Sequence, residues 1–195
     1  MYNNVIIVGN GESILHNKNG SIIDKFNTVI RLGRYELDGY EDYTGKKTDV
    51  VSTIYWKLDS DRLKNHKVIL SIPLNYTDDF KKSKEFIEHN YKDNIDNIMY
   101  VNTASDVEGI NKMYTDIMSP LADMSNINFS LGFKTFYFVQ KLFPNKKIYA
   151  TGFDFFKTGW YWDSLHNRDD SNRHPYIWER LWYSRMKALG NIYEL

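Results

Sequence analysis

His174 and Glu179 are the side chains whose types and spacing are best suited to acid–base chemistry; they form an H-x4-E pattern. An imidazole titrates near neutral pH, so it can accept a proton from a hydroxyl group. Glu179 follows a little over one helical turn later, and we expect it to support the local fold rather than transfer protons. The spacing alone occurs by chance in many proteins. By itself it more readily describes a histidine at a helix start that bonds a backbone carbonyl.

A second candidate site is the turn Gly9-Asn10-Gly11, which follows the β-branched run Val5-Ile6-Ile7-Val8. Ligands of open α/β sheets bind at the carboxyl ends of strands. Glycines there let the backbone approach a phosphate or ribose, and exposed amides favour an anion. Neither common nucleotide motif is complete, because position 14 is Ile and no Gly-Lys-Ser/Thr sequence follows. The turn therefore indicates either a nucleotide site or a plain tight bend.

Two further patterns carry polar groups. Ser130-Leu131-Gly132 opens a predicted helix, where a hydroxyl and free amides either bind a carboxylate or phosphate or form an ordinary N-cap. Asp59-Ser60-Asp61 has the D-x-D form that metal-dependent glycosyltransferases use to hold a divalent cation. Acidic pairs at this spacing are common on protein surfaces, so we predict no metal site there.

Composition narrows the class of protein. The 195 residues are enough for one buried domain, expected to span 1–195. The net charge is zero, which gives no electrostatic footprint for nucleic acid, and the lack of cysteine excludes disulfides and Cys-ligated metals. No run approaches the roughly 18 apolar residues of a membrane span, and no signal peptide is visible. We expect a soluble protein of the cytoplasm.

The elements that must position these residues alternate between strand and helix, which favours βαβ units and an α/β fold with a mainly parallel sheet. Pro175 suits a first helical turn, where its missing N–H costs nothing. The expected strands are 4–8, 28–32, 49–54, 67–72, 98–101, 147–151 and 191–193, and the expected helices are 78–89, 106–118, 130–142 and 175–189.

The first third of the chain resembles a known motif. Together with the turn at Gly9-Asn10-Gly11, the segments Ile23-Asp24-Lys25-Phe26-Asn27-Thr28-Val29-Ile30-Arg31-Leu32-Gly33, Gly39-Tyr40-Glu41 and Gly45-Lys46-Lys47-Thr48-Asp49 are similar to the large sialylmotif. This motif belongs to the sialyltransferases of glycosyltransferase family 29. The opening segment from Val5 to Ser13 is also similar to the start of the bacterial sialyltransferases of family 42.

Three more motifs follow in the order of that family. Ser130-Leu131-Gly132 with the later segment Lys147-Ile148-Tyr149-Ala150-Thr151-Gly152-Phe153 resembles the small sialylmotif. Trp160-Tyr161-Trp162 is similar to the aromatic third motif, and the segment from His174 to Glu179 to the very small motif. Four motifs in the correct order are a far stronger signal than any one alone. Residues 55–126 carry no usable resemblance.

The resemblance implies a single Rossmann-like α/β/α sandwich, a GT-A-like sialyltransferase variant. It also implies an inverting transfer of sialic acid from CMP-sialic acid to a hydroxyl of an acceptor glycan. No metal or other cofactor is required, since the CMP-sugar is a co-substrate. The implied partners are this donor and the acceptor, with no nucleic acid and no membrane span. The resemblance assigns His174 as the general base. The absence of the animal family's disulfide and anchor is consistent with a microbial or viral origin.

The residues expected to bind the donor follow from the same motifs. They are Asn10, Gly11, Gly33, Ser130, Gly132 and Gly152, with Thr53 as a further candidate at a strand end. The chain departs from the families at Gly33, where family 29 has a nucleotide-binding asparagine, and at Phe156, where family 42 has a tyrosine. At the first position, either Arg34 or water substitutes for the asparagine, or the donor is bound differently. Tyr161 or His166 can take the phosphate role of the missing tyrosine.

Other functions remain open on the sequence. A donor such as CMP-Kdo would use a similar cytidine site. A nucleotide-binding protein without transferase activity is a second alternative, and Gly33 and Phe156 favour it because both remove expected donor contacts. A Rossmann oxidoreductase is a third, and the incomplete G-x-G-x-x-G pattern argues against it.

Overall fold

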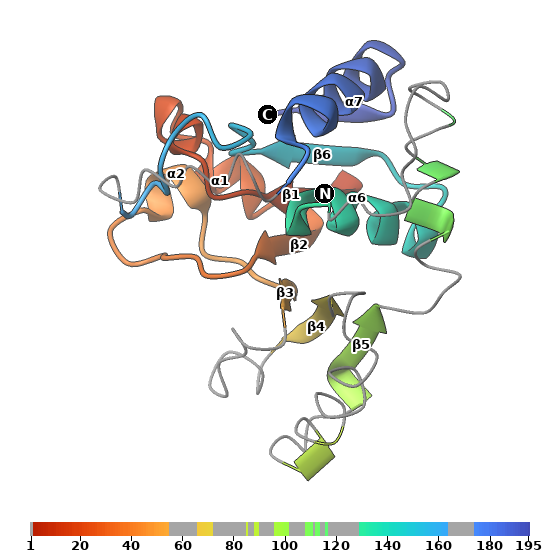
Figure 1. Ribbon diagram of the computed structural model, residues 1–195. Helices are drawn as coiled ribbons and strands as arrows, with labels where there is room; N and C mark the ends of the chain where they lie inside the picture. Colours follow the sequence, from red (N-terminus) through yellow and green to blue (C-terminus); the bar gives the residue numbers. More distant parts are fainter. Residues whose placement is uncertain are drawn as a thin grey trace.

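The computed structural model describes residues 2–54, 66–71, 85, 88–89, 96–101, 108–110, 112–113, 116, 129–163 and 174–195. These residues contain a seven-stranded sheet in the order β5-β4-β3-β2-β1-β6-β7 (Figure 1). Every neighbouring pair is parallel, so the expected parallel sheet is confirmed. The strands are β1 (Tyr2–Val8), β2 (Phe26–Leu32), β3 (Val50–Ile54), β4 (Lys67–Ser71), β5 (Ile98–Val101), β6 (Ile148–Thr151) and β7 (Ile192–Glu194).

The order of the strands defines where a ligand site belongs. Strands β2 to β5 extend from one side of β1, and β6 and β7 lie on its other side. The chain therefore reverses its direction of travel across the sheet at β1. In open α/β sheets the crevice outside the carboxyl ends of the strands at such a switch point is the usual ligand site. Here the switch point lies between β1 and β6, so a ligand site is expected at the residues that follow these two strands.

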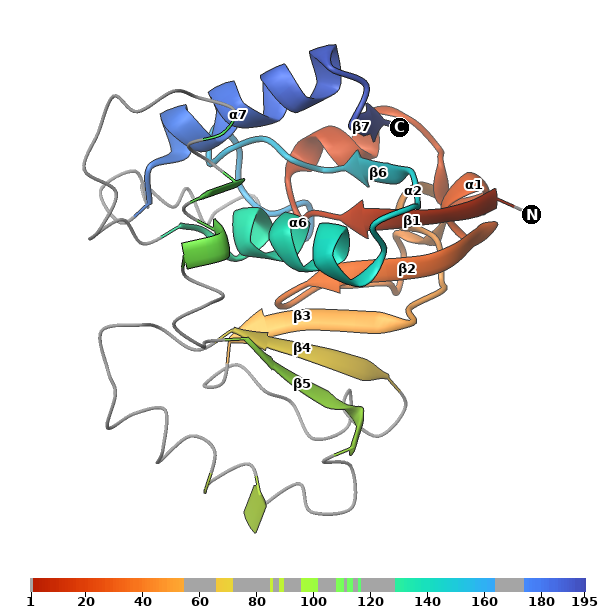
Figure 2. The ribbon, with the colours of Figure 1, turned by 90° about the vertical axis from the view of Figure 1, so that its right-hand side faces the viewer.

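Both faces of the sheet are covered, as Figure 2 shows. Side chains alternate along a strand, so Val5 and Ile7 of β1 belong to the core beneath helices α6 (Leu131–Leu142) and α7 (Tyr176–Ala188). Ile6 and Val8 point to the opposite core. That core includes residues of the short elements η1 (Glu12–His16) and α1 (Gly20–Ile23). A continuous apolar run in β1 is the pattern expected for a strand buried on both faces.

The helix predictions have three outcomes. Helices α6 and α7 confirm the predictions for 130–142 and 175–189 to within one residue at each end. The predicted helices 78–89 and 106–118 lie largely outside the described residues; the described parts, 85, 88–89, 108–110, 112–113 and 116, are helical. The elements η1, α1 and α2 (Glu41–Thr44) were not predicted, because four or five residues are too few to show a helical period.

The described part of the chain has neither a membrane-spanning helix nor a metal-binding cluster. No helix there is long and apolar enough to cross a membrane. No group of three or more His, Cys, Asp or Glu side chains is arranged to hold a metal ion there. The D-x-D pattern at 59–61 lies outside the described residues.

Candidate functional site

The ends of β1 and β6 run side by side beyond their last paired residues. The amide of Gly9 donates to the Thr151 carbonyl at 2.8 Å, and the amide of Gly11 donates to the Gly152 carbonyl at 2.9 Å. A Cβ at Gly9 would collide with the Gly152 carbonyl, and Gly152 has φ of +70°, a left-handed conformation that glycine adopts without strain. These two glycines are therefore explained by the close approach of the two strand ends.

Gly11 makes room for a carboxylate that was not among the predicted site residues. A Cβ at Gly11 would collide with the carboxyl group of Asp154. Oδ2 of Asp154 accepts hydrogen bonds from the Ser13 amide at 2.9 Å and from the Thr158 hydroxyl. Asp154 thus satisfies an amide at the start of η1 and fixes the turn after β6 against the turn after β1.

Asn10 joins the turn after β1 to the segment after β2. Its Nδ2 donates to the carbonyls of Leu32, at 2.8 Å, and Arg34, at 2.9 Å. These are the residues on either side of Gly33. Carbonyl oxygens only accept, so these bonds assign the orientation of the Asn10 amide. Its Oδ1 is buried and accepts no hydrogen bond from any described residue. A buried acceptor without a protein donor is rare, and here it lies at the predicted ligand crevice.

Gly33 adopts a left-handed conformation with φ of +55°. Besides glycine, asparagine is one of the residues that adopt this conformation most readily. A Cβ here would meet only Leu131 Cδ2, at 3.8 Å, which is ordinary van der Waals contact. The backbone at this position therefore suits both the glycine of this chain and the asparagine of the similar motif.

Ser130 and Glu179 form a buried contact between α6 and α7. The Ser130 amide donates to Glu179 Oε1 at 2.7 Å, and the Ser130 hydroxyl donates to Glu179 Oε2 at 2.6 Å. The Ser130 hydroxyl also accepts a bond from the Phe133 amide at 3.3 Å, so Ser130 is the N-cap of α6. Each of these Ser130 groups thus has a protein partner. Among the described residues, the amides of Leu131 and Gly132 have none.

The environment of Glu179 is electrostatically unusual. Burial raises the pKa of its carboxyl group to about 7, although the two bonds from Ser130 and the charge of Lys134 act in the opposite direction. Burial in turn lowers the pKa of the Lys134 ammonium. Glu179 is thus a buried residue that links α7 to the N-cap of α6, and its carboxyl group gains a proton more readily than an exposed one.

His174 precedes α7, and its ring stacks on that of Phe156, with 5.8 Å between ring centroids and 21° between planes. Phe156 and its neighbour Phe155 have φ of 61° and 51°, values at which bulky side chains are strained. In this turn, Phe155 packs edge-on against Tyr183 at 5.2 Å, while Phe156 packs against His174. The strained turn after β6 is therefore in direct contact with the predicted base.

Residues 2–125 match the family model described as glycosyltransferase family 29 (sialyltransferase). The chain belongs to this family. Its members are CMP-sialic acid-dependent transferases and are generally metal-independent, so the predicted enzyme class and α/β fold are confirmed. No curated protein matches the sequence.

Solved sialyltransferase structures share the fold. A mammalian sialyltransferase matches with a TM-score of 0.73 at 14% identity, and its complex with Gal-beta-1-3GalNAc-ortho-nitrophenol matches with 0.71 at 14%. Each match covers 100% of this chain and 69% of the other. The sialyltransferase CstII from Campylobacter jejuni, in complex with the substrate analogue CMP-3FNeuAc, matches with 0.53 at 18% identity, over 99% of this chain and 81% of the other. At these identities the likeness concerns the fold alone.

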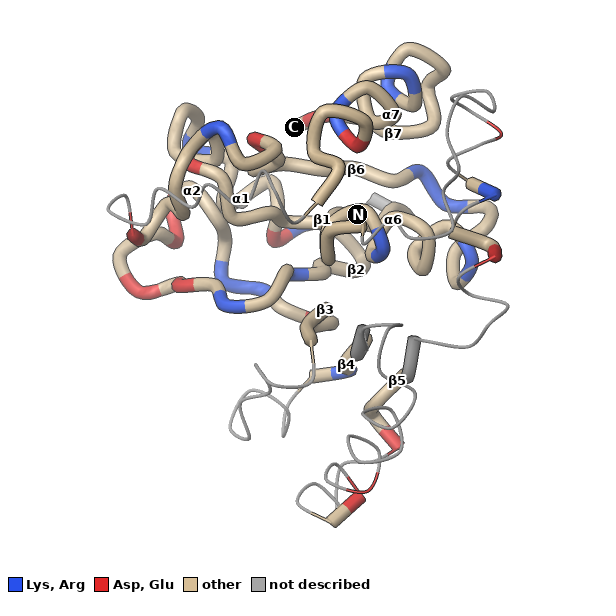
Figure 3. Tube along the Cα trace, in the orientation of Figure 1, with Lys and Arg blue, Asp and Glu red and all other residues tan. Residues whose placement is uncertain are grey.

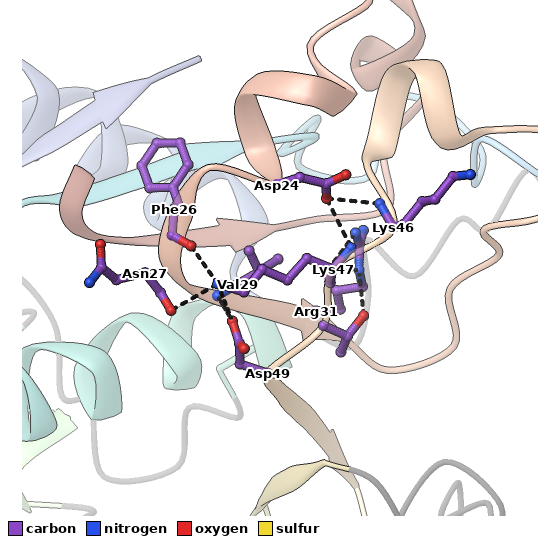
Figure 4. A network of polar contacts seen from close by, with 9 residues as sticks. Asp24, Phe26, Asn27, Val29, Arg31, Lys46, Lys47 and Asp49 are labelled. Atoms are coloured by element: carbon purple, nitrogen blue, oxygen red, sulfur yellow. Dashed lines mark hydrogen bonds and ion pairs between the residues drawn. The ribbon is translucent and has the colours of Figure 1, made fainter. Parts of the chain in front are cut away.

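In this family 29 chain, much of the large sialylmotif serves the scaffold, as Figure 4 shows. Asp24 Oδ1 accepts bonds from the Lys46 and Lys47 amides at 2.8 and 2.9 Å, and Asp49 accepts one from the Val29 amide at 2.8 Å. Arg31 is fully buried and donates to the carbonyls of three loop residues, Thr44, Gly45 and Lys47. These bonds hold the loop before β3 against β2, which positions the carboxyl end of β2.

The remaining predicted contacts of the family 29 site have different surroundings. Tyr161 is buried, and its hydroxyl accepts a bond from the Glu36 amide at 3.0 Å and donates to the Glu36 carbonyl. Burial raises the pKa of Tyr161 to about 12. Thr53 is buried on β3, and its hydroxyl donates to the Ile54 carbonyl at 3.5 Å. His166 lies outside the described residues.

Proposed function

We propose that this chain is a single-domain, inverting and metal-independent sialyltransferase that uses CMP-sialic acid as donor and a glycan hydroxyl as acceptor. The observation that carries the proposal is the meeting of motif segments at the switch point. Asn10 bonds the residues on either side of Gly33, and Gly33 faces Leu131 at the start of α6. The Gly11 amide bonds the Gly152 carbonyl. Segments more than 100 residues apart thus meet at the carboxyl ends of β1 and β6.

The polar atoms of this crevice suit different parts of a CMP-sugar. The unpartnered Asn10 Oδ1 is an acceptor, so it matches a ribose hydroxyl or the cytosine amino group and not a phosphate oxygen. The amides of Leu131 and Gly132, which have no partner among the described residues, lie at the start of the 12-residue helix α6 and suit a phosphate or carboxylate. We assign Asn10, Gly11, Gly33, Gly132 and Gly152 to the walls of this donor site.

Ser130 and Thr53 support the donor site by holding the elements around it in place. The Ser130 hydroxyl and amide are both bonded to Glu179, so its contribution to the donor site is to hold the first turn of α6 in place. Thr53 is buried at the carboxyl end of the neighbouring strand β3. For the leaving phosphate, the two bonds between Tyr161 and Glu36 favour His166 and the α6 amides over Tyr161.

His174 is the proposed general base. Its imidazole accepts the proton of the acceptor hydroxyl as that oxygen forms a bond to the anomeric carbon. The bond from the anomeric carbon to the phosphate oxygen breaks, and its electron pair leaves with CMP. Stacking on Phe156 holds the ring of His174, and the link from Glu179 to Ser130 fixes the beginning of α7, which follows this base. Proton transfer to a positioned general base contributes on the order of 100- to 10,000-fold in rate.

A transfer assay tests the proposal. The protein is incubated with CMP-sialic acid and lactose, with and without EDTA, and the anomeric configuration of the product is read by NMR. We expect sialylated lactose of inverted configuration at an unchanged rate in EDTA. Transfer from CMP-Kdo in place of CMP-sialic acid would identify the other donor class. CMP binding without any transfer would identify an inactive nucleotide-binding protein, and NAD binding would overturn both assignments.

A further inference from the structure

A second concave site lies beside the proposed donor crevice. It is a cleft of about 750 Å³ between η1, the turn after β6 and the side of α7. Its lining includes none of the residues proposed to bind CMP. The cleft is therefore large enough for one or two sugar rings and has no assigned ligand.

The charges lining the cleft are predominantly basic. The two acidic side chains are already bonded: Asp154 accepts from Ser13 and Thr158, and Glu194 forms an ion pair with Lys187. The basic lining residues besides Lys187 are His16, Lys157 and Arg180. Within the described ranges, none of these three forms an ion pair. Figure 3 marks the basic positions of α7, on which Arg180 lies. Lys157, Lys187 and Arg180 outnumber Asp154 and Glu194 by one, so the lining has one excess positive charge.

Aromatic rings form one wall of the cleft. Phe153 and Phe155 pack against Tyr183 with centroid distances of 5.8 and 5.2 Å. Tyr183 is 4% exposed, and its hydroxyl has no hydrogen-bond partner in the described part of the chain. Burial raises the pKa of this phenol, so the hydroxyl stays protonated and can donate. An unpartnered buried donor on a lining residue is a second, independent indication that the cleft binds a ligand with acceptor oxygens.

We propose that this cleft binds an acidic sugar, a ring that carries a carboxylate, as an extension of the acceptor site. Aromatic faces suit the apolar face of a sugar ring, the cations of Lys157 and Arg180 suit its carboxylate, and the imidazole of His16 can donate a hydrogen bond to it. The inference rests on the proposed function, because it makes an acidic glycan the acceptor class. The strained turn connects the two sites: Phe155 lines the cleft, and the adjacent Phe156 stacks on His174.

Equilibrium binding with the donor site blocked tests this assignment. Titration calorimetry of the full chain, saturated with CMP, is carried out with 3′-sialyllactose, lactose and inorganic phosphate. We expect 3′-sialyllactose to bind at least about tenfold more tightly than either other probe, because only it has both ring and carboxylate. Equal binding of lactose would overturn the role of the charge. Equal binding of phosphate would overturn the role of the ring.

Matched variants locate the site. Arg180→Gln and Lys157→Gln are expected to weaken 3′-sialyllactose binding about tenfold, whereas Lys25→Gln, an exposed position outside the cleft, is expected to leave it unchanged. Tyr183→Phe removes only the hydroxyl and is expected to weaken binding severalfold. An unchanged affinity in Arg180→Gln and Lys157→Gln would overturn the proposal.

The same variants separate this inference from the proposed function. Arg180→Gln is expected to leave CMP affinity and transfer to lactose unchanged while reducing transfer to 3′-sialyllactose. One outcome is that no acceptor is sialylated, while the binding of 3′-sialyllactose still requires Arg180. The transferase proposal then fails, and the cleft remains an acidic-sugar site. If transfer occurs and Arg180 has no effect on either acceptor, only the cleft assignment fails.

Discussion

Glu179 accepts a hydrogen bond from the amide of Ser130 at 2.7 Å and another from its hydroxyl at 2.6 Å. The contact joins two segments, 49 residues apart, that resemble the small and very small sialylmotifs, and places the Glu179 carboxyl group at the N-terminus of α6. The Glu179 carboxyl group thereby accepts the hydrogen bonds of the N-cap residue at the positive end of the α6 dipole. The pairing also fixes α7, which begins just after His174, against the helix whose first turn borders the proposed donor site.

The pH dependence of stability follows from this contact. The pKa of Glu179 is about 7 in the folded protein and 4.5 as an ordinary value, so between these limits the folded state holds a proton that the unfolded state has lost. Stability from this group is present below about pH 4.5 and is lost as pH rises through 7, with a slope of up to about 1.4 kcal/mol per pH unit. Urea unfolding of Glu179→Gln between pH 5 and 8 should lack this slope. The exposed Glu108→Gln should retain it; equal slopes in both variants would contradict the expectation.

Ser130→Ala tests the structural value of the same contact. The substitution removes the hydroxyl that donates to Glu179 and caps the Phe133 amide, leaving a buried carboxylate with one donor fewer. We expect a loss of about 1–3 kcal/mol in the free energy of unfolding. Ser21→Ala, at an exposed position, should change it by less than about 0.5 kcal/mol. A Ser130→Ala variant as stable as Ser21→Ala would show that the contact adds nothing.

Asn10→Asp is expected to be more harmful than its small change in shape suggests. It replaces the Nδ2 donor with an oxygen that faces the carbonyls of Leu32 and Arg34, so two hydrogen bonds become repulsive contacts. We expect a stability loss of about 2 kcal/mol or more and a large loss of CMP affinity, measured by urea unfolding and calorimetry. Asn27→Asp, at an exposed position of β2, is the control. Unaltered stability would refute the bonding of Asn10 described above.

Gly33→Asn is expected to improve the donor site. Asparagine tolerates the left-handed conformation, and its Cβ would have space beside Leu131. The added amide would stand where the similar sialylmotif has its asparagine, next to the proposed donor site, so we expect CMP to bind more tightly. Gly33→Ala has the same Cβ without the amide and should lose about 1–2 kcal/mol of stability with no gain in affinity. Titration calorimetry with CMP measures the affinity of both variants. An affinity of Gly33→Asn no higher than that of the unmodified protein would contradict the expectation.

His174→Ala tests the proposed base. Turnover should fall by roughly 100-fold or more, while CMP affinity stays close to that of the unmodified protein, because the base acts on the acceptor hydroxyl. The exposed His89→Ala should leave both quantities unchanged. Unchanged turnover in His174→Ala would remove His174 from the mechanism.

The strands were predictable because their signal is local. The run from Val5 to Val8 has the β-branched composition of a doubly buried strand, and every predicted strand lies within two residues of an observed one. The parallel arrangement was predictable from the alternation with helices. The four motifs, in order, were sufficient to indicate the family.

Contacts between distant residues were not predictable in the same way. No property of residues 130 or 179 alone indicates that Glu179 satisfies Ser130, or that the Asn10 amide faces two carbonyls beyond β2. The sequence by itself determined the strands and the order of the motifs, and it indicated His174 as the candidate base. Only the tertiary structure decided which polar groups are already bonded, as in Ser130 and Tyr161, and which remain available, as in Asn10 Oδ1. The physical reason is that hydrogen-bond satisfaction depends on where separate segments meet after folding, and this meeting is not encoded in any one of them.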